Sequence, residues 1–87
     1  MPTWTGATTS YSVATNWSGG LPTNTTDAIF DGSVSNNNCI VNITNLVCFN
    51  FTIQNGYTGT ITFTNTLTVR GSITFIASVF LLGLMGL

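Results

Sequence analysis

The chain has 87 residues, of which 44% are hydrophobic and only 3% are charged. The charged residues are Asp27, Asp31 and Arg70, and there is no Lys, Glu or His. A single Arg cannot neutralise a row of phosphates, which excludes nucleic-acid binding. The absence of His, Lys and Glu removes the usual general bases and metal ligands. Composition therefore favours a non-enzymatic structural protein without a cofactor or a metal.

A chain of this length predicts one small domain. Such a domain buries only about 60% of the surface that its unfolded chain exposes, so its own core is marginal. We therefore expect further stabilisation from a disulfide, from a neighbouring subunit or from more chain.

Residues 1–38 are predicted to form an N-terminal cap that is rich in turns. Turn signals occur at Ser18-Gly19-Gly20, Asp31-Gly32 and Asn36-Asn37-Asn38. One short strand is expected at residues 28–30, and no stretch has helical periodicity.

The first residues lack the basic and apolar regions of a signal peptide. This suggests either export by another route, such as release of virions at lysis, or a missing leader.

Residues 39–75 form a second segment, in which apolar and polar side chains alternate. Apolar residues occupy mainly the odd positions, which is the period of a strand with one buried face. The alternation continues far beyond the about 5–6 residues of a usual strand, so the chain must bend repeatedly. The side chains predicted to be buried are Val41, Ile43, Phe51, Ile53, Ile61, Phe63, Leu67, Val69 and Ile73.

An internal repeat accompanies this alternation, because Asn45, Asn55 and Asn65 recur every ten residues. We interpret the repeat as a strand and a corner, with an inward Asn satisfying backbone groups at each corner. Two such units would make a solenoid coil of roughly twenty residues. The pair Asn55-Gly56 is also a type I′ hairpin signal, which is typical of a meander. The uniform repeat favours an all-β fold, a short β-solenoid (parallel β-helix-like) with an N-terminal cap; the alternative is an antiparallel β-sandwich or meander.

Several motifs occur in a fixed order: Trp4-Thr5-Gly6, Asn16-Trp17-Ser18-Gly19-Gly20, Pro22-Thr23, Asp27-Ala28-Ile29-Phe30-Asp31-Gly32, Cys39-Ile40-Val41-Asn42 and Gly56-Tyr57-Thr58-Gly59-Thr60-Ile61-Thr62. In this order the chain resembles the Thr-rich β-strand-repeat (parallel β-helix) structural proteins of environmental phages and bacterial surfaces. The resemblance covers about residues 3–75. It implies an N-terminal cap followed by stacked coils, an adhesin-like or fibre-like role, and no catalytic residues.

The two cysteines, Cys39 and Cys48, leave two alternatives open. They could form a disulfide, which would suit an extracellular setting. They could equally be two small buried thiols. No further ligand residues accompany them, so they match no metal-binding pattern.

Two residue pairs are candidates for ligand binding. Trp4 and Trp17 could stack on a sugar, but we favour a role in covering the end of the β-core. Asp27 and Asp31 could offer oxygens to Ca²⁺, but two carboxylates without a third acid make a weak site. We expect Asp31 to close a turn with Gly32 instead.

Four asparagines lie in Asn-x-Ser/Thr sequons and are candidate glycosylation sites if the producing organism glycosylates its secreted proteins. They are Asn16, Asn24, Asn42 and Asn50. The last two fall on the even, outward positions, where a glycan would fit.

Outward Thr residues from Thr58 to Thr68 could also form a flat hydroxyl array for ice or a polysaccharide. We favour the simpler explanation that Thr is a good strand former.

The C-terminal segment, residues 76–87, is almost entirely apolar. It is shorter than the about 20 residues of a membrane span, so we expect a core strand or a buried contact instead. The residues predicted to make an assembly contact are Val79, Phe80, Leu81, Leu82, Leu84, Met85 and Leu87.

Together these observations predict a non-enzymatic structural subunit of an extracellular assembly. The first hypothesis is a phage virion-surface protein of the decoration, cement or fibre type. The alternatives are a subunit of an extracellular filament or adhesin, which would carry glycans, and a carbohydrate-binding module. The expected partners are other copies of the chain or a larger structural protein, and glycans are also candidates. We expect no nucleic acid and no membrane span.

Overall fold

The computed structural model of the chain describes residues 2–76. Nearly all of its regular structure is β, apart from one 3₁₀ turn. Its elements are β1 (Thr3–Trp4), the 3₁₀ turn (Ala14–Asn16), β2 (Trp17–Ser18), β3 (Ala28–Asp31), β4 (Cys39–Val41), β5 (Leu46–Cys48), β6 (Phe51–Gln54), β7 (Ile61–Phe63), β8 (Leu67–Val69) and β9 (Ile73–Ile76).

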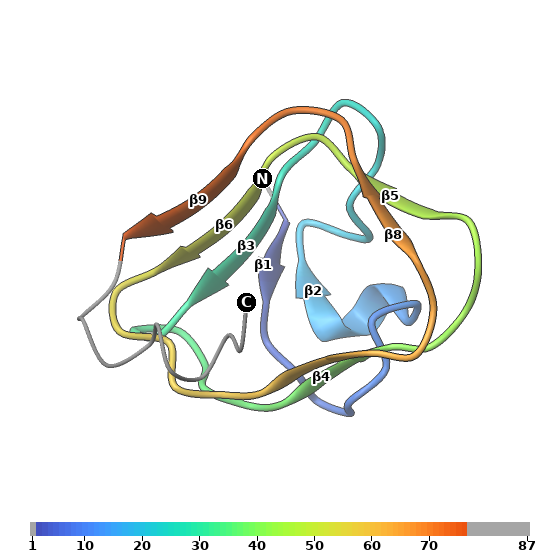
Figure 1. The fold of residues 1–87 in the computed structure, drawn as a ribbon. Coiled ribbons are helices and arrows are strands. Elements are labelled where there is room, and N and C mark those ends of the chain that lie inside the picture. The colour runs from blue at the N-terminus through green and yellow to red at the C-terminus, as the bar shows by residue number, and fades with distance from the viewer. Residues whose placement is uncertain (1, 77–87) are drawn as a thin grey trace.

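The strands stack into a β-solenoid of about three turns with three sheets around a common core. One sheet has the order β2-β1-β3-β6-β9, and the other two pair β4 with β7 and β5 with β8. Figure 1 shows the sheets as three sides of the coil, with β3, β6 and β9 side by side. Every strand pair is parallel except β1 with β2. The predicted β-solenoid is therefore confirmed, and the antiparallel alternative is wrong.

One coil takes about 22 residues, close to the predicted twenty. Cys39 lies opposite Ile61, and Phe51 lies opposite Ile73. The ten-residue repeat, however, is not the structural unit, because each coil contains three short strands and three corners. Asn45 and Asn55 do stand at corners, with φ of 65° and 53°. Both side chains are exposed, so the expectation of inward Asn residues is wrong: their role is to turn the backbone in the left-handed region that Asn tolerates.

The predicted alternation of odd positions inward breaks at β5. This strand buries the even-numbered Leu46 and Cys48, while Val47 is only half-buried. Four residues, 42–45, separate β4 from β5, so the inward positions change parity. Ile43 lies in this corner and is 47% exposed, contrary to prediction.

The next corner restores the register. Two residues separate β5 from β6, whereas the equivalent corners of the following coil each contain three. The longer and shorter corners compensate, so β6 and β9 face each other without a slip. The extra residue in one corner is therefore offset by the shorter corner that follows it in the same coil.

The rest of the predicted buried set falls into two groups. Val41, Phe51 and Ile53 are buried as predicted, and Ile61, Leu67 and Val69 pack partly buried against the core. Phe63 and Ile73 are 51% and 61% exposed. Each is in register with an inward residue of the coil before it, so they occupy inward positions that no further described coil covers.

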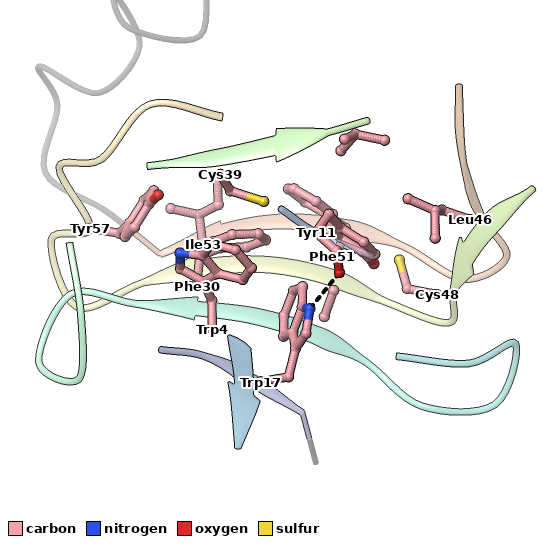
Figure 2. Close-up of a cluster of buried hydrophobic side chains, with 12 residues drawn as sticks. Trp4, Tyr11, Trp17, Phe30, Cys39, Leu46, Cys48, Phe51, Ile53 and Tyr57 are labelled. Carbon is pink, nitrogen blue, oxygen red and sulfur yellow. Dashed lines mark hydrogen bonds between the residues drawn. The ribbon is translucent and has the colours of Figure 1, made fainter. Parts of the chain in front are cut away.

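Aromatic side chains fill the interior of the coils (Figure 2). Trp4 and Trp17 pack edge to face with ring centroids 5.1 Å apart, and both contact Phe30. Phe30 in turn packs on Phe51 of the next coil at 5.3 Å. Edge-to-face and tilted aromatic pairs of this kind contribute about 0.5–1.5 kcal/mol beyond their buried area. The predicted cap and the coils therefore share one core.

Candidate functional site

The N-terminal end of the solenoid is closed by its own aromatic residues. Trp4 is fully buried and Trp17 is 4% exposed. The Trp4 indole donates to the Asn37 carbonyl at 3.0 Å, and the Trp17 indole donates to the Tyr11 carbonyl at 2.9 Å. Neither ring is free to stack on a sugar. The structure therefore supports the covering role that we favoured for the two tryptophans.

Asn16 fixes the loop that crosses this end. It is fully buried, and its amide nitrogen donates to the Thr8 hydroxyl and the Ser10 carbonyl at 2.7 and 2.8 Å. Its amide oxygen accepts from the Thr8 backbone N–H at 2.8 Å. A buried amide with every partner satisfied has no room for a glycan. The predicted glycosylation of Asn16 is therefore wrong for the folded chain.

Two of the three sheets are blocked at this end. The antiparallel β2 lies beside β1, and Ser10 forms a bridge with Ile40 at the edge of β4. In Figure 1, β2 and the 3₁₀ turn lie inside the outline drawn by the sheets. In these two sheets the parallel ladder stops here, because an incoming strand would meet β2 or Ser10 instead of the free edge of β1 or β4.

The opposite end of the described coils is open. Strands β7, β8 and β9 each have a described partner on one side only. Their outer edges carry backbone N–H and C=O groups with the geometry of a parallel ladder. Phe63 and Ile73 stand beside these edges at inward, uncovered positions. Within residues 2–76, this edge combines unpaired strands with exposed apolar side chains, and it is the candidate functional site.

Side-chain oxygens at the corners tie each coil to the next. The amide oxygens of Asn36, Asn38 and Asn50 accept the backbone N–H groups of the residues 22 positions further on: Thr58 at 2.8 Å, Thr60 at 2.9 Å and Ser72 at 2.8 Å. Asp27 does the same one coil earlier, accepting from the Asn50 N–H at 3.2 Å. This role of Asn and Asp was not predicted from the sequence. Aligning each corner with the corner 22 residues further along the chain would have been the way to detect it.

The two aspartates do not form a common site. Asp27 lies before β3 and Asp31 ends it. The Asp31 carboxylate accepts from the Ser33 N–H and hydroxyl, from Gln54 and from Asn55 at 2.6–3.0 Å. These hydrogen bonds, that of the Ser33 side chain first, hold the pKa of Asp31 well below its usual range. No cluster of three or more metal-ligating side chains occurs in the described part of the chain.

Cys39 and Cys48 are free thiols in the structure, and both are buried. They belong to different sheets, and their sulfur atoms lie inside the coil (Figure 2). Burial raises the pKa of Cys39 to about 12 and also raises the pKa of Cys48. The arrangement corresponds to the second alternative from the sequence, two small buried thiols.

The remaining sequons differ in accessibility. Asn24 and Asn42 are exposed, and Asn42 donates one hydrogen bond to the Ser10 hydroxyl at 2.9 Å. Asn50 was expected to point outward, but it is half-buried and its amide oxygen accepts from Ser72. A glycan on Asn50 would have to displace this corner, so Asn24 and Asn42 remain the accessible candidates.

The Thr residues from Thr58 to Thr68 do not form one flat array. Thr62 lies on β7 and Thr68 lies on β8, which belong to different sheets. The series therefore winds around the coil, and its hydroxyls face several directions. This arrangement agrees with the simpler explanation of Thr as a strand former.

The predicted contact residues Val79 to Leu87 lie outside the described residues. Within residues 2–76, no helix has the length and apolar character needed to cross a membrane.

A scan of the chain against protein-family models finds no match, and searches of curated proteins and of solved structures find no similar protein. The family resemblance inferred from the motifs stays a prediction.

Proposed function

We propose that this chain is a non-enzymatic structural subunit of an extracellular assembly, and that it is a virion-surface protein of the decoration, cement or fibre type. The observation that carries the proposal is the difference between the two ends of the solenoid. One end is plugged by Trp4 and Trp17, and the other, within residues 2–76, leaves three strand edges and the side chains of Phe63 and Ile73 uncovered. Such an edge takes up strands from a partner by backbone pairing.

The composition agrees with burial in an assembly. The chain carries only three charged residues, so little repulsion opposes edge-to-edge contact. Exposed apolar residues beside free edges mark contact surfaces in proteins. The partners in this proposal are other copies of the chain or a larger structural protein.

Sedimentation velocity on substituted chains tests the proposal. We expect the unchanged chain to associate, and Phe63→Asp or Ile73→Asp to prevent association by placing a buried charge in the contact. Val34→Asp is the matched control, because Val34 is also 54% exposed but lies in the turn after β3, away from the open edge. Circular dichroism verifies that all three variants keep their strands. Equal association of all variants would refute the proposal.

A subunit of a cellular filament or adhesin is the second candidate, and the exposed sequons at Asn24 and Asn42 favour it. Intact mass measurement of the chain purified from its natural source would reveal glycans there. The burial of both tryptophans argues against a carbohydrate-binding module that uses them.

A further inference from the structure

The corner between β6 and β7 holds the only Asn-Gly pair of the sequence, Asn55-Gly56. An Asn followed by Gly is chemically labile, because the Gly backbone nitrogen can attack the Asn side-chain carbonyl carbon with little steric hindrance. Asn55 is exposed, and the two residues have φ of 53° and 70°. No atom lies within 4 Å of the place where a Gly56 Cβ would stand. There is thus free space beside the Gly56 backbone, and no side chain crowds this peptide unit.

Asp31 of the preceding coil holds the group that would leave. The Asn55 amide nitrogen donates to both Asp31 carboxylate oxygens, each at 3.0 Å. The Ser33 hydroxyl holds the same carboxylate at 2.6 Å, so its position is fixed. A neighbouring carboxylate disfavours the negative charge that the Gly56 nitrogen must develop before it attacks. The hydrogen bonds also restrain the rotation of the amide.

We propose that Asn55 is a site of spontaneous deamidation and that Asp31 limits its rate in the folded chain. The Gly56 nitrogen loses its proton and bonds to the Asn55 Cγ, and the amide nitrogen departs as ammonia after taking up a proton. Water then opens the cyclic imide at either carbonyl, which gives Asp or isoAsp. No oxidant or reductant is needed, and water is the only co-reactant.

Both products disturb the stack of coils. A carboxylate at position 55 would replace a donor by a second acceptor that faces Asp31 across a hydrogen-bond distance. An isoAsp would lengthen the backbone where it lies against Gly32. That contact has no spare room, since a Cβ on Gly32 would overlap the Asn55 carbonyl oxygen. Deamidation would therefore loosen the contact between the corner after β3 and the corner after β6, which stack on each other.

Peptide mass spectrometry of the full chain, incubated at mildly alkaline pH, tests the proposal. Deamidation adds about 1 Da, and separation of the peptides distinguishes Asp from isoAsp. We expect slower conversion in the folded chain than in guanidinium, and several-fold faster conversion in folded Asp31→Ala. Ser33→Ala keeps the carboxylate but removes its 2.6 Å hydrogen bond from the Ser33 hydroxyl, so the carboxylate is held less firmly and the rate should be intermediate. This variant also provides the test if Asp31→Ala fails to fold. Equal rates in the folded and the unfolded chain, or in Ser33→Ala and the unchanged chain, would overturn the role of Asp31.

A second measurement uses the product directly. Asn55→Asp should lower the urea midpoint at neutral pH, because the like charge of Asp31 raises the pKa of the new carboxyl in the folded state. The loss should shrink as the pH falls and that carboxyl takes up its proton. Asn45→Asp is the matched control, since Asn45 has φ of 65° but no carboxylate partner in the described chain. A pH-dependent loss of the same size in both variants would contradict the contact with Asp31.

Discussion

Phe51 links two layers of the core, because its ring packs on Phe30 below at 5.3 Å and on Phe63 above at 6.4 Å. Its side chain is 4% exposed, whereas that of Phe49, two positions earlier, is 42% exposed. The same residue type is thus exposed in the corner before β6 and buried in the first position of β6. Substituting each of the two phenylalanines therefore separates the effect of burial on stability from the effect of the residue type.

We expect Phe51→Ala to lower the free energy of unfolding by about 3–5 kcal/mol, because the truncated side chain leaves a cavity among aromatic neighbours. Phe49→Ala should cost less than about 1 kcal/mol, since it leaves no cavity. Urea unfolding followed by tryptophan fluorescence measures both. A similar cost for the two substitutions would show that β6 does not face the core as described.

The cysteines give a second prediction at this scale. Cys39 and Cys48 are buried and their pKa values are raised, so little thiolate is present to react. Neither thiol should react with a chromogenic disulfide reagent in the folded chain, and both should react after denaturation without a reductant. Absence of reaction in the denatured chain would mean that the two residues are bonded to each other.

At the scale of the elements, the alternation of residues was sufficient to predict strands with an inward face, and the Asn repeat predicted a coil of about the right length. The alternation failed at corners, because the length and backbone geometry of a corner determine which residues of the next strand point inward. The sequence does not show that Asn45 adopts a left-handed conformation or that the corner before Leu46 has four residues, and these two features exchange the buried positions in β5. The coil-to-coil acceptors were missed because Asn36, Asn38 and Asn50 share no local pattern. Their common feature is a partner 22 residues away.

The corner acceptors should stabilise the stacking of coils. Replacing Asn50 by Ala removes the oxygen that accepts the Ser72 N–H at 2.8 Å. We expect a loss of about 1 kcal/mol, since the freed N–H can still reach water. Compared with the unchanged chain, the variant should show faster native-state hydrogen exchange at Ser72 and in β9, and the increase in β4 should be smaller. Asn24→Ala, in an exposed loop, is the control and should leave both the stability and the exchange unchanged.

At the scale of the whole molecule, the apolar C-terminal contact predicted from the sequence lies outside the described residues and can be tested by deletion. We expect deletion of residues 77–87 to abolish association of the chain, because it removes every residue of the apolar contact predicted from the sequence. Residues 2–76 hold all of the described strands, so the shortened chain should keep its circular dichroism spectrum. Light scattering across a concentration series measures the association. A stable, soluble monomer of the intact chain at high concentration would contradict the subunit hypothesis.

The closed N-terminal end also limits which symmetries the assembly can have. Head-to-tail addition of identical chains needs open edges at both ends, and at the N-terminal end β2 and Ser10 cover the edges of two of the three sheets. Copies that meet through the same open edge, formed by β7, β8 and β9, would be related by a twofold axis, which makes a closed pair. Continued growth of the full three-sheet ladder beyond such a pair would meet the covered edges of β1 and β4, so contacts along the sides of the coils are the simpler way for identical chains to build a longer array.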